Sequence, residues 1–290
     1  MDVLTDRTGV VIGGGGGIGR GVSLGLAYAG MNVVVADIEL DSATRVADEI
    51  TRAGGRSIAR RVDATSADSL DSLAETTIVE FGAVHVLSNN VGVILNRRLD
   101  EATEAEWSWF VEFNVMSIVR GNLAFLPHLR AHRQGGHIVN TSSMAGLLAL
   151  EPRAVGGYFN GLYTTTKHAL IGYCEMLRME LAPERIGVSV LCPGLVAGNL
   201  SSTAARNRPE RFGGPLADPR AGAPPNPAAM PNDAVGPIVV DAIRANRFYV
   251  FTHPDSVALV RARHQHVLDD FEFYRTRSYP MTAPPLGDSD

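Results

Sequence analysis

Short apolar runs alternate along the chain with longer segments in which apolar and polar positions recur at helical spacing. This alternation lasts to about residue 193 and is typical of β-α-β units that build a parallel sheet. The apolar runs predict strands at Gly9–Ile12, Asn32–Asp37, Ser57–Val62, Val84–Asn89, His137–Thr141 and Gly187–Cys192. The periodic segments predict helices at Ile18–Ala29, Asp41–Ala53, Ser66–Phe81, Glu104–His132 and Tyr163–Ala182. The pattern therefore predicts an α/β fold.

The pattern changes after this region. Residues 198–231 are rich in Ala, Pro, Arg, Asn and Gly without a sustained period, and such a long loop in a compact domain is typical of a substrate lid. The elements predicted after it are a helix at Asp233–Ala245, a strand at Arg247–Phe251 and a helix at Asp255–Phe271, followed by a loose tail over 282–290. A length of 290 residues fits a single domain over 1–290.

Composition narrows the class of protein. The net charge of −5, with 45% hydrophobic and 20% charged residues, is ordinary for a soluble globular protein and argues against a nucleic-acid groove. The sequence contains no apolar run long enough for a membrane span and no visible secretory signal, so we expect a cytoplasmic protein. Cys174 and Cys192 are predicted to be buried reduced thiols. The histidine pairs lack acidic or cysteine partners, so no metal site is expected.

A run of glycines, Gly13 to Gly17, follows the first predicted strand and opens the first predicted helix. Glycines permit positive φ and let a pyrophosphate approach the positive end of a helix, although a glycine run alone is equally compatible with a flexible loop. Asp37 ends the second predicted strand, where a carboxylate can accept from both ribose hydroxyls and repels a 2′-phosphate. Taken alone, Asp37 could equally be an acidic residue at the N-terminus of the next helix. Together the two features predict binding of NAD.

Lys167 is the one lysine of a chain that has 25 arginines. Codon bias would explain the arginines, but Lys167 also lies four residues after Tyr163, on the same face of a predicted helix. A phenol titrates near pH 10, and a nearby ammonium lowers its pKa. The spacing therefore predicts that Tyr163 is a base assisted by Lys167, the alternative being an ordinary helix surface pair.

The order of the motifs resembles that of the short-chain dehydrogenase/reductase family over roughly residues 5 to 255. The motifs are Gly13-x-x-x-Gly17-x-Gly19, Asn89-Asn90-Val91-Gly92, Asn114, Ser142-Ser143, Tyr163-x-x-x-Lys167 and Pro193-Gly194-Leu195-Val196. The resemblance implies a doubly wound, seven-stranded parallel sheet, a nicotinamide cofactor and reversible oxidoreduction of alcohols and carbonyls. It also implies a homo-oligomer, a dimer or tetramer, that packs through the helices at Glu104–His132 and Tyr163–Ala182.

The resemblance also implies roles for individual residues. Tyr163 would be the general acid/base, Lys167 would lower its pKa and hold the nicotinamide ribose, Ser143 would bind the substrate oxygen, and Asn114 would hold a water of a proton relay. Read without the family, Ser143 is a strand-end turn residue and Asn114 a solvated position. The implied cofactor-binding set is Gly13, Gly17, Ile18, Gly19, Asp37, Asp63, Ala64, Asn90, Gly92, Tyr163, Lys167, Pro193, Gly194 and Val196.

The chain departs from the family pattern at several positions. Ile12 stands where the family has Thr, so a side-chain hydrogen bond to the turn after the fourth strand is expected to be missing. Gly198 stands where the family has a second Thr, after Pro193-Gly194, so one side-chain contact to the nicotinamide carboxamide is in doubt. Residues 147–162 are expanded and are predicted to bulge beside the substrate and shape specificity. The aromatic residues of the helix at Glu104–His132 are expected in the core and at subunit contacts; they are Trp107, Trp109, Phe110 and Phe113.

The leading hypothesis is an NAD-dependent dehydrogenase of a secondary alcohol, or a ketone reductase, with an apolar or aromatic small-molecule substrate. Two alternatives stay open. One is a non-catalytic NAD-binding regulator with the same fold, which would not need Ser143, Tyr163 and Lys167 together. The other is an epimerase or dehydratase of the extended branch of the family, which shares the tyrosine–lysine motif but is disfavoured by the glycine spacing and the short C-terminal part.

Overall fold

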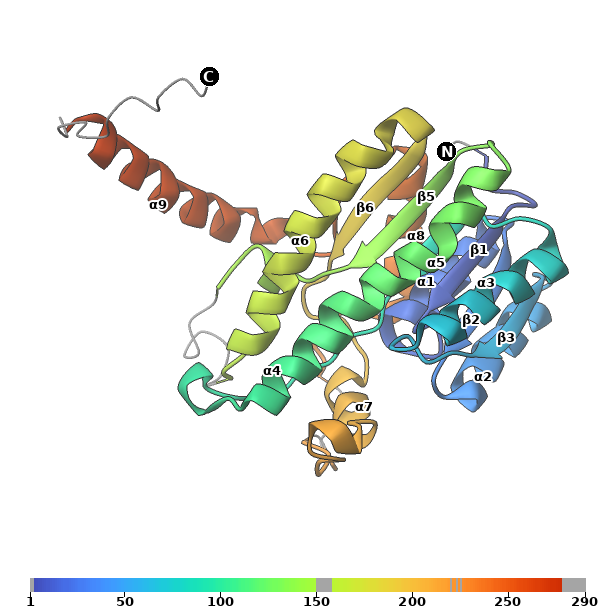
Figure 1. Cartoon of the computed structure of the whole chain (residues 1–290), viewed down its shortest axis with the longest axis horizontal. Helices are drawn as coiled ribbons and strands as arrows, with labels where there is room; N and C mark the ends of the chain where they lie inside the picture. Colours follow the sequence, from blue (N-terminus) through green and yellow to red (C-terminus); the bar gives the residue numbers. More distant parts are fainter. Residues whose placement is uncertain (1–2, 150–157, 220, 223, 225, 278–290) are drawn as a thin grey trace, which may run out of the picture. The chain divides into compact units, whose positions relative to one another are not determined.

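The computed structural model of the chain describes residues 3–149, 158–219, 221–222, 224 and 226–277. Its centre is a seven-stranded, all-parallel sheet with the strand order β3-β2-β1-β4-β5-β6-β7 (Figure 1). The strands are β1 (Thr8–Ile12), β2 (Asn32–Asp37), β3 (Ser57–Arg61), β4 (Val86–Asn89), β5 (Gly136–Thr141), β6 (Ile186–Cys192) and β7 (Tyr249–Phe251). The predicted α/β class and the seven-stranded sheet are confirmed.

Helices cover both faces of this sheet. The helices are α1 (Gly17–Tyr28), α2 (Leu40–Arg52), α3 (Ala67–Phe81), α4 (Glu104–Val111), α5 (Ser117–Ala131), α6 (Gly161–Leu181), α7 (Leu200–Arg206), α8 (Val235–Arg244) and α9 (Val257–Arg275). Helices α1 and α8 pack together on one face, and α3 packs on α5 on the other, where α6 also lies (Figure 1). This doubly wound arrangement is the one predicted.

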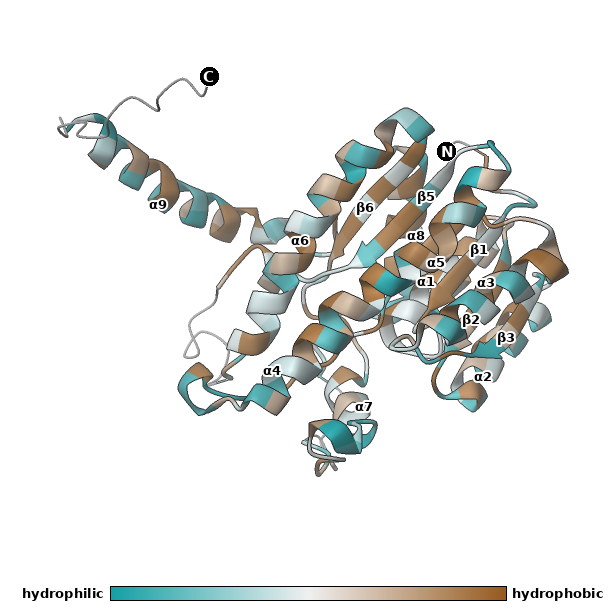
Figure 2. Cartoon of the chain, in the orientation of Figure 1, coloured by the Kyte–Doolittle hydropathy of each residue, from teal (hydrophilic) through white to brown (hydrophobic). Residues whose placement is uncertain are grey.

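The sheet is apolar because both of its faces are buried. All residues of β1, β4 and β5 are buried, whereas the edge strand β3 is partly exposed. In Figure 2 the central strands are mostly brown, the colour of apolar residues, while teal is frequent on the outer helices. Near-continuous apolar strands are what a parallel sheet between two helical layers requires.

The helix predicted over Glu104–His132 is confirmed as an unbroken helical run from Glu104 to Ala131. Within this run a π-helical turn, Glu112–Met116, separates α4 from α5. Helix α4 begins with a capping box, in which Thr103 Oγ1 accepts from the Glu106 amide at 3.2 Å and Glu106 Oε2 accepts from the Thr103 amide at 3.0 Å. A π turn shifts the backbone register within a helix, and such turns are frequent at functional sites.

The chain clusters into two compact units, residues 1–253 and residues 254–290, and a single domain over 1–290 stays a prediction. The second unit contains α9, in which no residue is buried. Cys174 and Cys192 are buried and free, as predicted. Among the described helices, none combines the length and the apolarity needed to cross a membrane.

Candidate active site

The predicted site residues follow the carboxyl ends of neighbouring strands. Gly13 follows β1, Asp37 ends β2, Asn90 follows β4, Ser143 lies two residues after β5, and Pro193 follows β6. Because all the strands are parallel, these positions meet at one edge of the sheet (Figure 1). The strand order reverses between β1 and β4, and in open α/β sheets ligands bind at such a switch point.

The glycine turn between β1 and α1 has the geometry of an anion cradle. Gly13 and Gly17 have φ of +74° and +51°, which favour glycine. At Gly19 an added Cβ would lie 1.9 Å from the carbonyl oxygen of Gly13, so no side chain fits there. The N-terminus of α1 has neither a side-chain cap nor an acidic residue in its first turn. Its amides are therefore left for an anionic ligand.

Asp37 is held against this turn. Its Oδ2 accepts from the Gly15 amide at 2.9 Å, and its Oδ1 accepts from the Glu39 amide at 3.1 Å. Burial raises the pKa of Asp37, and these amide bonds act in the opposite direction. The structure thus places the predicted ribose-binding carboxylate beside the predicted pyrophosphate turn.

Asp63 lies in the turn after β3, where its Oδ1 accepts from the Thr65 amide at 2.9 Å and from Thr65 Oγ1 at 2.7 Å. This carboxylate closes its own turn, and the adjacent Ala64 is buried. The local bonds hold Asp63 at the same edge of the sheet as Asp37.

Asn90 ties the turn after β4 to the neighbouring strands. Its Nδ2 donates to the carbonyl oxygen of Ile12 at 3.2 Å, and its Oδ1 accepts from Thr141 Oγ1 at 2.8 Å. The link to β1 is thus made through the Ile12 main chain and needs no hydroxyl at that position. Gly92 lies close to the catalytic candidates, since an added Cβ would be 3.0 Å from Asn114 Oδ1 and 3.5 Å from Lys167 Nζ.

The structure brings Ser143, Tyr163 and Lys167 together, although Ser143 and Tyr163 are far apart in sequence. The Ser143 side chain lies near enough to the Tyr163 phenol to act on its pKa, which it lowers by hydrogen bonding. The Lys167 side chain is buried, its Nζ donates to the carbonyl oxygen of Thr141 at 2.8 Å, and it lies 5.5 Å from the centroid of the Tyr163 ring. Both residues come from the first turns of α6, four residues apart, so they share a helix face as expected.

Burial sets the ionisation of this pair. Burial raises the pKa of Tyr163 to about 12, and the hydrogen bond with Ser143 acts against this rise. Burial also lowers the pKa of Lys167 to about 8. A low-dielectric site disfavours both the phenolate and the ammonium. In the chain without a ligand, burial outweighs the groups that would lower the pKa of Tyr163, so this pKa lies above its ordinary value.

Asn114 lies within the π turn and is fully buried, so it is not a solvated position. Its Oδ1 accepts from the Val93 amide at 2.7 Å. Its Nδ2 donates to the carbonyl oxygen of Val93 at 3.1 Å and to Thr166 Oγ1 at 3.0 Å. Both amide hydrogens are thus used within the chain, and the side chain fastens the π turn to the loop after β4 and to α6.

The predicted lid begins beside the cofactor residues. Val196 forms an isolated β-bridge with Met230, and this bridge closes the base of the lid. Gly198 crosses the glycine turn, where a Cβ on Gly198 would lie 3.4 Å from the Cα of Gly17. The lid also contains the short helix α7, which the aperiodic composition did not predict.

Residues at the end of α7 bind Glu39, which lies two residues after Asp37. Arg206 Nη2 pairs with Glu39 Oε1 at 2.5 Å, and Asn207 Nδ2 donates to the same oxygen at 3.1 Å. The hydrogen bond from Arg206 is the main cause that lowers the pKa of Glu39. Because Glu39 is two residues from Asp37, these bonds couple the lid to the predicted ribose site.

On its other side the lid packs against an apolar cluster. The buried members are Val93, Trp109, Phe110, Leu162, Ala204 and Phe212, and Tyr163 packs against them. Trp109 and Phe110 are buried, as expected for core aromatics. Arg208 of the lid is also buried, with its guanidinium carbon 4.8 Å from the centroid of the Trp109 ring. The wall next to Tyr163 is thus apolar and aromatic. The Arg208 cation lies against the Trp109 ring of this wall.

Part of the expanded segment 147–162 lies within the described residues, and 150–157 lie outside them. Phe159 is fixed by its main chain, since its carbonyl oxygen accepts from the Arg97 amide at 2.9 Å and its amide donates to Asn96 Oδ1 at 2.7 Å. The end of the segment therefore pairs with the loop that follows β4.

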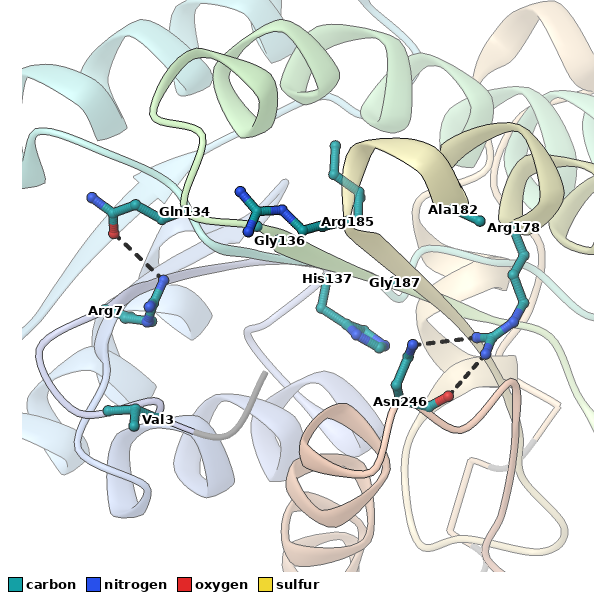
Figure 3. Close-up of a pocket in the computed structure, with 12 residues that line it drawn as sticks. Val3, Arg7, Gln134, Gly136, His137, Arg178, Ala182, Arg185, Gly187 and Asn246 are labelled. Atoms are coloured by element: carbon teal, nitrogen blue, oxygen red, sulfur yellow. Dashed lines mark hydrogen bonds between the residues drawn. The ribbon is translucent and has the colours of Figure 1, made fainter.

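A cavity of about 670 Å³ lies at the opposite, amino edge of the sheet (Figure 3). Arg7, Arg178, Arg185, His137 and Asn246 line it, and Figure 3 shows Arg178 bonded to Asn246. Burial lowers the pKa of His137 to about 3, so this histidine is neutral at pH 7. None of the predicted site residues lies here.

Sequence reasoning missed Glu39, Arg206 and Thr166, and it gave Arg208 no role of its own. Glu39 had one signal, its place two residues after Asp37. Arg206 had none, because it is one among 25 arginines. In the part of the chain that the structure describes, no group of three His, Cys, Asp or Glu side chains is placed to hold a metal ion.

Comparisons with known proteins agree with this geometry. Residues 7–209 match the family model for the short chain dehydrogenase. A 1-deoxy-11-beta-hydroxypentalenate dehydrogenase from Streptomyces exfoliatus is 31% identical over 97% of this chain and 93% of its own. A 2-dehydro-3-deoxy-D-gluconate 5-dehydrogenase from Escherichia coli is 29% identical over 84% of this chain and 91% of its own. A crystal structure of a short chain dehydrogenase/reductase from Burkholderia phymatum in complex with NAD is 30% identical, with a TM-score of 0.81 over 98% of this chain and all of the other.

Proposed function

The chain belongs to the short-chain dehydrogenase family, and from this premise we propose that it is an NAD-dependent dehydrogenase of a secondary alcohol, acting in reverse as a ketone reductase. The observation that carries the proposal is the contact between Ser143 and Tyr163 with the buried Lys167 beside them. A non-catalytic regulator would need only the glycine turn and Asp37.

The residues present fit NAD. The glycines leave a cradle that any Cβ would fill, the first turn of α1 has amides without caps, and Asp37 is fixed beside them. We assign the pyrophosphate to the Gly13–Gly19 turn and the adenosine ribose to Asp37, whose charge disfavours the 2′-phosphate of NADP. When bound, NAD supplies the acceptor for the hydride of the alcohol.

Ser143 and Tyr163 handle the oxygen and its proton. Ser143 holds the substrate oxygen by a hydrogen bond, and Tyr163 exchanges a proton with it. With a pKa of about 12, the Tyr163 phenol is protonated at neutral pH and suited to donate to a ketone oxygen. Alcohol oxidation requires the phenolate, so we expect its rate to rise with pH.

Lys167 and Asn114 support this proton transfer. The Lys167 ammonium, 5.5 Å from the Tyr163 ring, stabilises the phenolate as it forms. The Asn114 side chain is occupied by Val93 and Thr166, so we assign the relay water to its main-chain carbonyl oxygen in the π turn.

The wall beside Tyr163 favours an apolar or aromatic small-molecule substrate, and the expanded segment 147–162 is proposed to select among such substrates. We further propose a cytoplasmic homo-oligomer, a dimer or tetramer, that packs through α4, α5 and α6.

The test is a panel of secondary alcohols, aliphatic to aryl, incubated with NAD or NADP while absorbance is followed at the reduced-nicotinamide band. We expect reduction of NAD with at least one apolar alcohol and much slower reduction of NADP. Tight NADH binding without any turnover would favour the regulator instead, and conversion of a substrate without net reduction of NAD would favour the epimerase or dehydratase.

A further inference from the structure

Arg208, in the lid, is a buried cation that has no hydrogen-bonding or ionic partner among the residues that the structure describes. Its exposed fraction is 8%, and within the described residues it makes no hydrogen bond and no ion pair. Its Nε is enclosed and has no acceptor. An uncompensated buried charge is costly, so chains rarely keep one without a ligand or a counter-ion.

The neighbouring arginines of the same segment find carboxylates on the elements that the lid packs against. Arg206 pairs with Glu39 at 2.5 Å, and Arg211 lies 3.8 Å from a carboxylate oxygen of Glu112. Both of these arginines are more than half exposed, where an ion pair contributes little. Within the described part of the chain, these two exposed guanidiniums are thus paired with carboxylates and the buried guanidinium of Arg208 is not.

The guanidinium of Arg208 is held in a fixed place. It stacks on the Trp109 ring, and Gly213 lies beside it with φ of +108°, where an added Cβ would be 3.0 Å from Arg208 Nη2. The indole Nε1 of Trp109 is itself buried without an acceptor. The ring on which the Arg208 guanidinium stacks thus carries a second buried N–H donor without an acceptor, and buried donors of this kind call for an acceptor such as an anionic oxygen.

This pair of donors borders the proposed reaction site. Trp109 and Phe212 belong to the apolar cluster against which Tyr163 packs. A ligand that reaches from Tyr163 to Arg208 would therefore cross an apolar wall before it meets the cation.

We propose that Arg208, together with the indole N–H of Trp109, binds a carboxylate of the substrate, so that the substrate is an apolar hydroxy or keto acid. The inference rests on the proposed function, because the reacting oxygen is the one held by Ser143 and Tyr163. A planar carboxylate fits the fork of a guanidinium and the adjacent indole donor.

The test compares straight-chain and aryl keto acids of increasing length with their methyl esters, using NADH as reductant. For the best chain length we expect the acid to exceed its ester at least tenfold in kcat/KM. Arg208→Met should remove this preference, and Arg208→Lys should restore part of it. Arg211→Met is the matched control in the same segment and should keep the preference.

Two binding measurements keep the proposal testable if a variant folds poorly. For the wild-type protein, an arylalkanoate should raise Tm in the presence of NADH, whereas its uncharged amide should not. Arg208→Met should bind NADH as the wild type does. Equal use of acids and esters, or a Tm shift with the amide as large as with the acid, would overturn the carboxylate site. Weaker NADH binding by Arg208→Met would also overturn it, by assigning the guanidinium to the cofactor.

These outcomes are distinct from failure of the proposed function. If no ketone, keto acid or ester is reduced, the proposed dehydrogenase activity is wrong. If ketones are reduced without regard to charge, only the role of Arg208 is wrong.

Discussion

Two buried cations, one at the sheet edge and one in the lid, differ in how the chain treats them. Lys167 is 3% exposed and Arg208 is 8% exposed. Lys167 donates to the carbonyl oxygen of Thr141, and burial lowers its pKa to about 8, so it can release its proton. Arg208 has no acceptor within the described residues, and a guanidinium cannot release its proton. Lys167 is thus satisfied by the chain, whereas Arg208 lacks a hydrogen-bond acceptor among the described residues.

The same contrast holds for other polar groups of the two regions. Asn114, Asn90 and Ser142 each bond to other parts of the chain at the carboxyl edge. The buried side-chain atoms without a partner, over the described ranges, are Asn89 Oδ1, Trp109 Nε1, Thr203 Oγ1 and Arg208 Nε. Thr203 and Arg208 lie in the lid, Trp109 is stacked against Arg208, and Asn89 ends β4 at the sheet edge. Three of the four unmet hydrogen bonds are therefore in the lid or against it, as in a binding site, while most polar groups of the sheet edge are held by the chain.

The largest expected effect comes from replacing the buried lysine, Lys167, by an arginine. Lys167→Arg should lower kcat/KM about a thousandfold, which corresponds to about 4 kcal/mol. The planar guanidinium does not fit where Nζ reaches Thr141 and where Gly92 approaches closely. Steady-state kinetics on the best alcohol measure this, with Arg178→Lys as the control. Full activity of Lys167→Arg would remove the special role of the lysine.

The two cations should also differ in how pH changes stability. In the folded chain the pKa of Lys167 falls from 10.5 to about 8, so between these pH values the unfolded chain binds more protons and stability rises with pH. The rise should amount to about 3 kcal/mol in the wild type relative to Lys167→Met. Urea unfolding at the two ends of the window measures it.

Arg208→Met provides the control for that measurement. Because the guanidinium stays charged, the stability difference between Arg208→Met and the wild type should be the same at both pH values. A parallel pH dependence of the wild type and Lys167→Met would contradict the low pKa of Lys167.

The preference for NAD over NADP tests the role of Asp37 at the carboxyl edge of the sheet. Asp37 should make NAD bind at least tenfold more tightly than NADP, a difference of about 1.4 kcal/mol. Asp37→Ala should remove most of this preference, while Asp48→Ala on the outside of α2 should keep it. Titration of each cofactor by fluorescence gives the dissociation constants, and equal values in the wild type would speak against the ribose site.

The smallest effect is expected where lid and edge meet. Glu39→Gln weakens the bonds to Arg206 and Asn207, and it should raise KM for NAD by about two- to fivefold with little change in kcat, since a partly exposed ion pair is weak. Asp100→Asn, which breaks the surface pair with Arg98, is the control. An unchanged KM would show that the lid is not coupled to the ribose site through Glu39.

The sheet could be predicted from sequence more closely than the lid, and for a physical reason. The buried strand β2 was predicted to its exact ends, because an apolar run between polar residues marks a strand that is covered on both faces. The motif residues at its end and at the ends of β1, β4 and β5 then met at one edge because parallel strands leave no other choice. Pattern and topology were sufficient there.

The π turn and the lid had no such signal. One extra residue in a helical turn hardly changes the spacing of apolar positions, so α4 and α5 read as one helix. Helix α7 has only seven residues, too few for a period. Arg208 is one of many arginines, and its burial follows from contacts with Trp109 and Gly213 that are distant in sequence or depend on the fold of the lid.

The most direct test of the account replaces the proposed acid/base alone. Tyr163→Phe removes the hydroxyl that meets Ser143 and leaves the ring that packs in the apolar cluster. Absorbance at the reduced-nicotinamide band, followed with the best alcohol and NAD, should show that kcat falls at least a thousandfold, while NADH binds as tightly as to the wild type. A Tyr163→Phe enzyme that retains the wild-type kcat would contradict the account at its centre.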